Sequence, residues 1–341
     1  MSKTYKIAVL KGDGIGPEIT EATIKVLEAV QEKADFKLDL IYGEAGAHCI
    51  PTFGTNLPKE TLEMIKQTDA CLKGPMTTPE EAGAPPSVAV TLRSIFKLYA
   101  NVRPCKTFPN VESLKPNLDF VVVRENTEGL YSGAEFQLAP GVAIALRIIT
   151  KEACLNVVEY AFKLAEKRKK HLTYIHKGNI LRITDGIFKE AVQELAPKHP
   201  TVTVDDLHID AATMQLIKKP EIYDVLVTTN LFGDIISDEA AQVVGGLGMA
   251  GGANVGDNYG MFEPIHGSAP KYTGMNRANP ISNIMAASMM LDYLGETDAA
   301  TKIEKAVTEI LGEGKVRTLD IGGTATTSEF TDALAAKVRT L

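Results

Sequence analysis

The feature that most limits the possible fold is the stretch of residues 230–238, NLFGDIISD, which follows the apolar run 224–229. β-branched residues fill that run and NLFG breaks it, so the sequence predicts a buried strand there. After Gly233 the apolar residues recur at helical spacing, which predicts a helix. Asp234 and Asp238 are four residues apart and therefore lie on one side of that helix.

These two aspartates have two possible roles. Carboxylates at this spacing are about 6 Å apart and repel each other unless a cation lies between them. A hard divalent ion with oxygen ligands, Mg²⁺ or Mn²⁺, suits such a pair. In the alternative, Asp234 caps the helix and Asp238 faces solvent. The spacing alone leaves both interpretations open.

Length and composition narrow the class of protein. At 341 residues the chain exceeds a single ordinary core, which predicts two domains. No apolar run approaches the roughly 20 residues of a membrane helix, so we expect no membrane partner. The net charge of −7 argues against nucleic acid as a partner but leaves room for a local basic pocket.

The N-terminus and the cysteines predict a cytoplasmic location. The first six residues lead directly into an expected strand, which leaves no room for a signal peptide. Cys49, Cys71, Cys105 and Cys154 are scattered, without a CxxC pair or metal-ligand spacing. We therefore expect free thiols in a reducing compartment.

A glycine-rich turn, GDGIGPE at residues 12–18, follows the first expected strand. Its spacing is GxGxG, and Pro17 follows where a dinucleotide fingerprint requires a helix to start before its last glycine. No acidic residue ends a second strand at the expected distance. The turn is therefore a poor signal for a classical Rossmann fold.

Three arginines, Arg93, Arg103 and Arg124, lie at the edges of apolar segments in a chain that is acidic overall. Any one of them alone is typical of a surface residue. Together with the hydroxyl of Ser87 and the phenol of Tyr131, they predict a pocket for a polycarboxylate, because guanidinium groups bind carboxylates bidentately.

Further polar residues follow expected strands. Lys177 and Asn179 come after the strand 172–176, and Asp210 comes after the strand 201–209. Ligands usually bind at such strand ends, so Lys177 is either an acid/base group or a structural lysine.

The glycine-rich segment 245–257 predicts a close approach of the backbone to a neighbour. The loop that carries His266 and Lys271 is a weak nucleotide signal.

Taken together, these segments resemble the β-decarboxylating dehydrogenases, the family of isocitrate, isopropylmalate and homoisocitrate dehydrogenases. The resemblance runs from GDGIGPE at residues 12–18 to GGTATTSEF at residues 322–330. It is most specific from residue 230 through GLGM at residues 246–249. It favours the metal-binding interpretation of Asp234 and Asp238.

The resemblance implies an α/β fold of two domains, distinct from a classical Rossmann fold, in which the chain leaves one domain and later returns to it. The large domain would comprise residues 1–98 and 245–341, and the small domain residues 99–244. Residues 132–172 would form a clasp-like arm around a second subunit. Members are typically homodimers with shared active sites.

The resemblance also implies a role for each matching residue. The carboxylates of the substrate would be held by Arg93, Arg103 and Arg124, with Ser87 contacting a further group. Tyr131 and Lys177 would be the acid/base pair, with Lys177 and Asp210 coming from the partner subunit. Asp210, Asp234 and Asp238 would bind Mg²⁺ or Mn²⁺. The nucleotide would contact Thr78, Asn179, Glu263, His266, Gly267, Ser268, Ala269, Lys271, Tyr272, Asn279 and Asp320.

The substrate is predicted from residues 87–89. Ser87 replaces the apolar residue that isopropylmalate enzymes have, which favours a third carboxylate. Ala89 replaces the asparagine usual in isocitrate enzymes and keeps homoisocitrate as the alternative, whereas the flanking segments look like the isocitrate branch. We expect isocitrate. A non-catalytic regulatory subunit is disfavoured because the Tyr, Lys and Asp set is complete.

The nucleotide is predicted from two regions that disagree. Lys271 and Tyr272 form the pair of NADP-dependent members, and a lysine suits a phosphate. Leu319 and Gly323 stand where such members supply a tyrosine and an arginine, and these two look NAD-like. We expect NADP, with NAD as the alternative.

Overall fold

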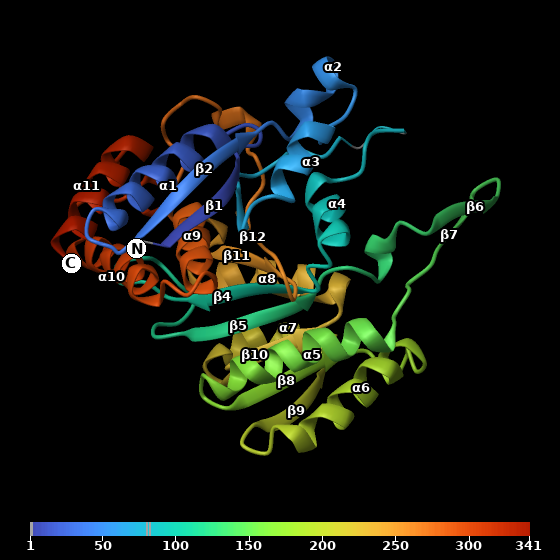
Figure 1. The fold of residues 1–341 in the computed structure, drawn as a ribbon. Helices are drawn as coiled ribbons and strands as arrows, with labels where there is room; N and C mark the ends of the chain where they lie inside the picture. The colour runs from blue at the N-terminus through green and yellow to red at the C-terminus, as the bar shows by residue number, and fades with distance from the viewer. Residues whose placement is uncertain (1–2, 80, 82) are drawn as a thin grey trace.

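A single mixed sheet of ten strands runs through the molecule (Figure 1). The computed structural model describes residues 3–79, 81 and 83–341. The strands lie in the order β2-β1-β3-β12-β11-β4-β5-β10-β8-β9. Their bounds are β1 (Lys3–Leu10), β2 (Phe36–Gly43), β3 (Ala70–Lys73), β4 (Ala100–Lys106), β5 (Asp119–Glu125), β8 (His171–His176), β9 (Thr203–His208), β10 (Val225–Thr228), β11 (Gly251–Val255) and β12 (Gly260–Pro264).

The sheet has a parallel block at each end and antiparallel pairs in its centre. β2, β1, β3 and β12 pair in parallel, as do β5, β10, β8 and β9. β12, β11, β4 and β5 pair antiparallel between them. One half draws its strands from residues 3–73 and 251–264, and the other from residues 100–228. The division at residues 98 and 245 stays a prediction, because the sheet is continuous across it.

Helices cover both faces of this sheet, which confirms the α/β fold that the sequence predicts (Figure 1). α1, α10 and α11 pack together at one end, and α5 packs against α6, β5 and β10 at the other. The bounds are α1 (Gly16–Gln31), α2 (Ile50–Phe53), α3 (Lys59–Ile65), α4 (Val88–Ile95), α5 (Lys151–Glu166), α6 (Thr184–Leu195), α7 (Ile209–Lys218), α8 (Asn230–Val244), α9 (Ile281–Tyr293), α10 (Thr297–Glu313) and α11 (Thr327–Thr340).

The glycine-rich segment that leads into β11 brings the backbone of Gly251, the first residue of β11, close to the backbone of α9, as predicted. A Cβ atom at Gly251 would lie 2.3 Å from the backbone nitrogen of Ala286 in α9. Only glycine allows this approach, which presses the buried helix α9 against β11. The contact holds α9 against the half of the sheet that contains β1, β3 and β12.

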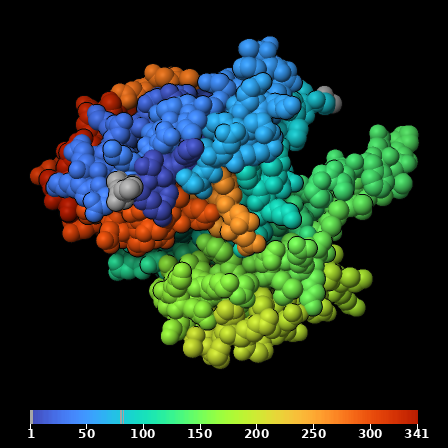
Figure 2. Space-filling view, in the orientation of Figure 1, coloured from blue at the N-terminus to red at the C-terminus, as the bar shows by residue number. Residues whose placement is uncertain are grey.

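The predicted arm is shorter than residues 132–172. The hairpin of β6 (Glu135–Ala139) and β7 (Val142–Ala145) projects from the body with exposed side chains (Figures 1 and 2). The rest of the range does not project, because α5 buries Val157 and Phe162 in the main core and β8 is a strand of the sheet. The apolar face of α5 therefore belongs to the domain and not to the arm.

The described part of the chain contains no helix with the length and apolar character needed to cross a bilayer.

Candidate active site

Three buried arginines converge from α4, β4 and β5. Arg93 on α4 donates to Asn254 at 3.0 Å and to the Glu263 carboxylate at 3.0 Å. Arg103 on β4 and Arg124 on β5 are also buried, and both reach α8. The guanidinium cluster that the sequence predicts is therefore present, and its members come from three different elements.

Helix α8 begins at Asn230, one turn earlier than predicted. Asn230 Oδ1 accepts hydrogen bonds from Arg124 Nε at 3.0 Å and from its Nη2 at 2.7 Å. Gly233 lies inside the helix, where an added Cβ would be 2.5 Å from Arg124 Cγ. The glycine is thus a packing requirement for Arg124 and not the boundary of the helix.

Arg103 shows that Asp234 and Asp238 share one side of α8, as predicted. Its Nη1 donates to Asp238 Oδ1 at 2.7 Å, and its Nη2 lies 3.7 Å from Asp234 Oδ1. Asp234 also contacts Arg124 Nη1 and accepts a 2.5 Å hydrogen bond from Tyr131. Neither aspartate caps the helix. Because Arg103 already lies between the carboxylates, their repulsion does not by itself require a metal ion.

The two carboxylates have different electrostatic environments. Burial favours the neutral form of Asp234, but Arg124 and the hydrogen bond from Tyr131 outweigh it and lower the pKa of Asp234. Burial raises the pKa of Asp238, and the charge of Asp234 adds to the shift while Arg103 opposes it. Burial lowers the pKa of Arg124 to about 10, with Arg93 contributing.

Two hard carboxylates suit Mg²⁺ or Mn²⁺. The side chain of Asp238 is 53% exposed, so an ion can reach it. The predicted third ligand lies elsewhere in the same chain: Asp210, in the first turn of α7, accepts a 2.6 Å hydrogen bond from Lys177 Nζ. Within the described chain, neither Lys177 nor Asp210 bonds to the three arginines. Their contribution across a dimer stays a prediction.

Asp185 is a buried neighbour of Lys177 that the sequence analysis missed. Its carboxylate is fully buried and accepts the backbone N–H of Lys177 at 2.6 Å. Its other oxygen pairs with Arg147 at 2.7 Å. Arg147 also donates to Thr184 at 2.7 Å and to Thr229 at 2.9 Å. No local pattern marks Asp185, because its importance arises from tertiary contacts alone.

A cavity of about 170 Å³ brings together three of the predicted substrate residues, whereas Arg124, Tyr131 and Lys177 do not line it. Ser87, Arg93 and Arg103 line it, as do His266 and Gly267. Glu263 also lines it, and its Oε2 pairs with Lys73 at 2.7 Å. Since the same carboxylate also accepts from Arg93, it holds two buried cations at this cavity, the candidate substrate cavity. Its contact with the nucleotide stays a prediction.

A second cavity, of about 530 Å³, collects most of the predicted nucleotide residues. It shares His266 and Gly267 with the substrate cavity, so the two spaces adjoin. Burial lowers the pKa of His266, which keeps its imidazole neutral at neutral pH. The wall also contains Arg277, which the sequence analysis missed. The predicted residues that line it are His266, Gly267, Ala269, Tyr272, Asn279 and Asp320.

Besides Glu263, four predicted nucleotide residues lie outside the wall of this second cavity. Ser268 is buried behind it, where its carbonyl accepts from the Ile15 N–H at 2.9 Å. Thr78 and Asn179 are exposed. Lys271 is exposed as well, and its ammonium group lies 4.8 Å from the ring centroid of Tyr272.

The turn at residues 12–16 packs against residues 267–269, the predicted nucleotide loop. A Cβ atom at Gly14 would lie 2.0 Å from the carbonyl oxygen of Ser268. The glycine therefore allows a close backbone approach between the turn and residues 267–269. This contact gives the GxGxG segment a role that its poor match to a dinucleotide fingerprint could not reveal.

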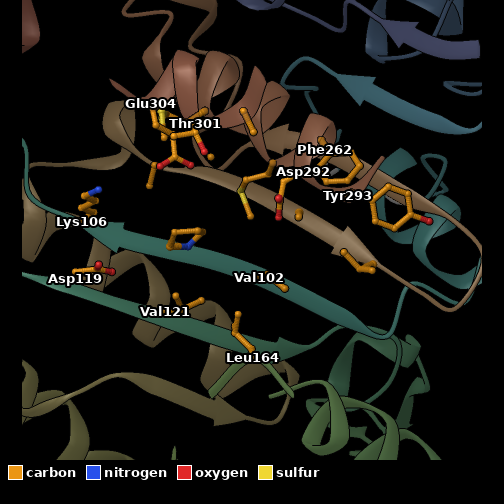
Figure 3. Close-up of a pocket in the computed structure, with 18 of the residues that line it drawn as sticks. Val102, Lys106, Asp119, Val121, Leu164, Phe262, Asp292, Tyr293, Thr301 and Glu304 are labelled. Carbon is orange, nitrogen blue, oxygen red and sulfur yellow. The ribbon is translucent and has the colours of Figure 1, made fainter. Parts of the chain in front are cut away.

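A third cavity, of about 410 Å³, lies on the other face of the sheet between the central strands and the helices α9 and α10 (Figure 3). Val102 on β4 and Val121 on β5 line it, opposite Thr301 and Glu304. Successive residues of a strand face opposite sides of a sheet, so Val102 and Arg103 face different cavities. None of the predicted site residues lines this third cavity.

Comparison with known proteins gives the family. A family model described as isocitrate/isopropylmalate dehydrogenase matches residues 6–334. The chain is 46% identical over 340 residues to the 3-isopropylmalate/3-methylmalate dehydrogenase of Methanocaldococcus jannaschii. The matched region covers 98% of this chain and 99% of that protein. It is 45% identical over 339 residues to the isocitrate/homoisocitrate dehydrogenase of Thermus thermophilus, covering 99% of each.

A solved structure agrees with these relatives. The fold matches the crystal structure of isocitrate dehydrogenase from Methylococcus capsulatus with a TM-score of 0.93 and 42% identity, covering 98% of this chain and 99% of that chain. The family generally uses NAD(P) and Mg²⁺ or Mn²⁺, acts on small carboxylates and is typically dimeric. The chain therefore belongs to the isocitrate/isopropylmalate dehydrogenase family, the β-decarboxylating dehydrogenases.

Proposed function

We propose that this protein oxidatively decarboxylates isocitrate to 2-oxoglutarate with NADP⁺ as the hydride acceptor, in a reaction that requires Mg²⁺ or Mn²⁺. The observation that carries the proposal is the shared wall of His266 and Gly267. Because a small cationic cavity and a larger nucleotide-sized cavity adjoin there, a bound carboxylic acid would lie next to the nucleotide.

The lining of the smaller cavity supports a tricarboxylate. Arg93 and Arg103 are buried in its wall, and Arg124 lies beside them through the shared contact with Asp234. Ser87 precedes the first residue of α4, where the helix dipole favours an additional anion. An isopropyl group would place methyl groups against this hydroxyl and against buried charge, which is unfavourable.

Three alternatives remain, and one of them, homoisocitrate oxidation, has the support of a particular residue. Ala89 lines the same cavity as Ser87 and leaves space for the extra methylene of homoisocitrate. Names of relatives include 3-isopropylmalate dehydrogenase, so that activity is the third choice. A regulatory subunit without catalytic activity is the least supported alternative, since Tyr131, Lys177 and Asp234 are all present and make polar contacts.

The residues of the chain supply proton transfer and charge stabilisation. Lys177 and Asp210 would together take the proton of the substrate hydroxyl, with Lys177 passing a proton to the Asp210 carboxylate as it accepts the one from the hydroxyl, while a hydride passes from the same carbon to the nicotinamide. The carboxylate on the carbon next to the new carbonyl group then leaves as CO₂. Tyr131 would donate a proton to the carbon that carried this carboxylate. A divalent ion held by Asp234 and Asp238 would supply positive charge where negative charge develops.

The placement of Lys177 supports a homodimer. Next to it, the side chains of Ile180 and Ile183 are highly exposed in the single chain, at 69% and 81%. A second subunit that covered these side chains would remove apolar surface from water and bring Lys177 and Asp210 to a neighbouring set of arginines. The four free cysteines are consistent with the proposed cytoplasmic location.

The cationic residues near the larger cavity support NADP⁺ over NAD⁺. Arg277 lines the cavity and Lys271 lies beside Tyr272 at its edge. Either cation can bind a 2′-phosphate. Asp320 opposes this preference, but its carboxylate is already engaged by Asn279 at 2.9 Å and by Thr318 at 2.6 Å.

Product analysis tests the proposal. The protein is incubated with isocitrate, NADP⁺ and Mg²⁺, and NADPH, CO₂ and 2-oxoglutarate are quantified. Equal amounts of the three products are expected, and none without the divalent ion. The Asp238→Asn variant should lose the reaction, whereas Asp257→Asn, outside the site, should retain it. Oxidation without CO₂ release, or no turnover, would contradict the proposal.

A further inference from the structure

A second group of metal-ligating side chains lies in the turn between β2 and α2, apart from the aspartates of α8. Glu44, His48 and Cys49 each place one ligand atom within 4.8 Å of the others. His48 Nε2 lies 3.0 Å from Glu44 Oε2 and 3.4 Å from Cys49 Sγ. The imidazole nitrogen is therefore at the centre of the group.

The two distances from His48 Nε2 suit a tetrahedral ion, and the Glu44 and Cys49 ligand atoms lie within 4.8 Å of each other. Zinc bonds of about 2.0–2.3 Å at tetrahedral angles place neighbouring ligand atoms about 3.3–3.6 Å apart. The two distances from His48 Nε2 lie within a few tenths of an ångström of that range. A nitrogen, a sulfur and an oxygen suit zinc, whereas Mg²⁺ and Mn²⁺ favour oxygen ligands such as those of Asp234 and Asp238.

A buried carboxylate orients the imidazole from behind. Asp13 Oδ1 lies 2.7 Å from His48 Nδ1, so with zinc bound the ring would donate to Asp13 and the ion would replace any proton on Nε2, the nitrogen beside Glu44 and Cys49. Histidines that bind metals almost always have such a partner on the other nitrogen. Asp13 is itself fixed by the backbone N–H groups of Ala47 at 2.9 Å and Thr77 at 2.8 Å.

The group is closed on the protein side and open to solvent. Cys49 is buried, whereas the side chains of Glu44 and His48 are 69% and 43% exposed. An ion can therefore enter from solvent, and a water molecule can complete the tetrahedron. Three protein ligands with one open position describe an accessible zinc site rather than a closed structural one.

We propose that Glu44, His48 and Cys49 form a zinc-binding site, with Asp13 as the residue that orients His48. On binding, the Cys49 thiol loses its proton to solvent and the sulfur forms the bond to zinc. The site is independent of the carboxylates proposed for Mg²⁺ or Mn²⁺, and it lies close to the nucleotide loop because Thr77 also hydrogen-bonds Ser268 at 2.7 Å.

Cobalt is the probe that separates this site from the active site. Co²⁺ is titrated anaerobically into the full-length protein with excess Mg²⁺ present, and absorption is recorded. A thiolate-to-cobalt charge-transfer band that saturates at one ion per chain, and that Zn²⁺ abolishes, is the expected result. Asp234 and Asp238 carry no sulfur and cannot produce such a band, so the outcome does not depend on the proposed activity.

Variants complete the test. Cys49→Ser should lose the band, and Asp13→Asn should weaken binding by about 10–100-fold. Glu44→Gln keeps the fold because its side chain is exposed, and it should also weaken binding. Cys154→Ser, equally buried but remote, should keep the band. Absence of the band in the unmodified protein, or its survival in Cys49→Ser, would overturn the proposal.

Discussion

The phenol of Tyr131 donates a 2.5 Å hydrogen bond to Oδ2 of Asp234, while Arg124 contacts the other oxygen of the same carboxylate. The guanidinium carbon of Arg124 also lies 4.9 Å from the centroid of the Tyr131 ring. Burial raises the pKa of Tyr131, and the bond to Asp234 adds to the shift. The phenol therefore stays protonated at neutral pH, as a proton donor must.

Replacing Tyr131 by phenylalanine removes the proposed proton donor and keeps the ring over Arg124. We expect kcat to fall by about 10²–10⁴-fold, the range for loss of a positioned acid, while KM for isocitrate changes little. Steady-state kinetics measure both. Tyr42→Phe, a half-exposed tyrosine outside the site, is the matched control. An unchanged kcat in the Tyr131 variant would exclude the assigned role.

Asp185 is predicted to be a positioning residue for Lys177. Asp185→Asn leaves Arg147 without its buried partner, so the free energy of unfolding should fall by about 3–5 kcal/mol. The kcat should fall as well, because the backbone of Lys177 loses its anchor. Urea unfolding and kinetics give the two values.

A second variant separates these two effects. Adding Arg147→Met to Asp185→Asn removes the unpaired charge and should restore part of the stability, but not kcat. If the double variant regained full activity, Asp185 would be a purely structural residue and the positioning role would be withdrawn.

The two cations beside Glu263 lead us to expect that the free energy of unfolding depends on pH. Burial alone would raise its pKa, but the cations Lys73 and Arg93 outweigh it and hold the pKa of Glu263 far below its ordinary value of about 4.3. Its contribution is therefore fully present above the unfolded-state pKa and is lost as pH falls towards the folded-state pKa.

Denaturant unfolding from about pH 7 to about pH 3.5 measures this contribution. Glu263→Gln should lower the free energy of unfolding by about 3–5 kcal/mol near neutrality, because two buried cations lose their partner. The difference from the unmodified protein should stay constant down to about pH 5 and shrink below about pH 4. Glu313→Gln, an exposed control, should change little at any pH. A difference that grew on acidification would refute the argument.

The nucleotide preference should depend on Lys271. Lys271→Gln removes one cation from the edge of the larger cavity, and kcat/KM for NADP⁺ should fall about tenfold, or about 1.4 kcal/mol, with little change for NAD⁺. Lys305→Gln, exposed on α10, is the control. Equal losses with both nucleotides would show that Lys271 does not select the 2′-phosphate.

The sequence allowed several parts of the fold and site to be predicted because their signals are local. The strand before α8, the i, i+4 placement of Asp234 and Asp238, and the family motifs all depend on residues close in the chain. The family resemblance also led to the grouping of His266, Gly267 and Ala269 with Asn279 and Asp320, and all five line one cavity.

Other features could not be predicted because they depend on long-range contacts. The start of α8 at Asn230 follows from its bonds to Arg124, which is 106 residues away. The anchoring of Lys177 by Asp185, and the engagement of Glu263 by Lys73 and Arg93, have no signature in spacing. The predicted arm was too long because the apolar face of α5 could not be assigned to the core from the sequence.

The central claim is that the cavity of Ser87 and the arginines selects isocitrate. The most direct test is to measure kcat/KM for isocitrate, homoisocitrate and isopropylmalate with NADP⁺ and with NAD⁺, in Mg²⁺ and again in EDTA. We predict the highest value for isocitrate with NADP⁺, and no turnover in EDTA. A higher value for isopropylmalate would contradict the assignment of Ser87 as a contact for a third carboxylate.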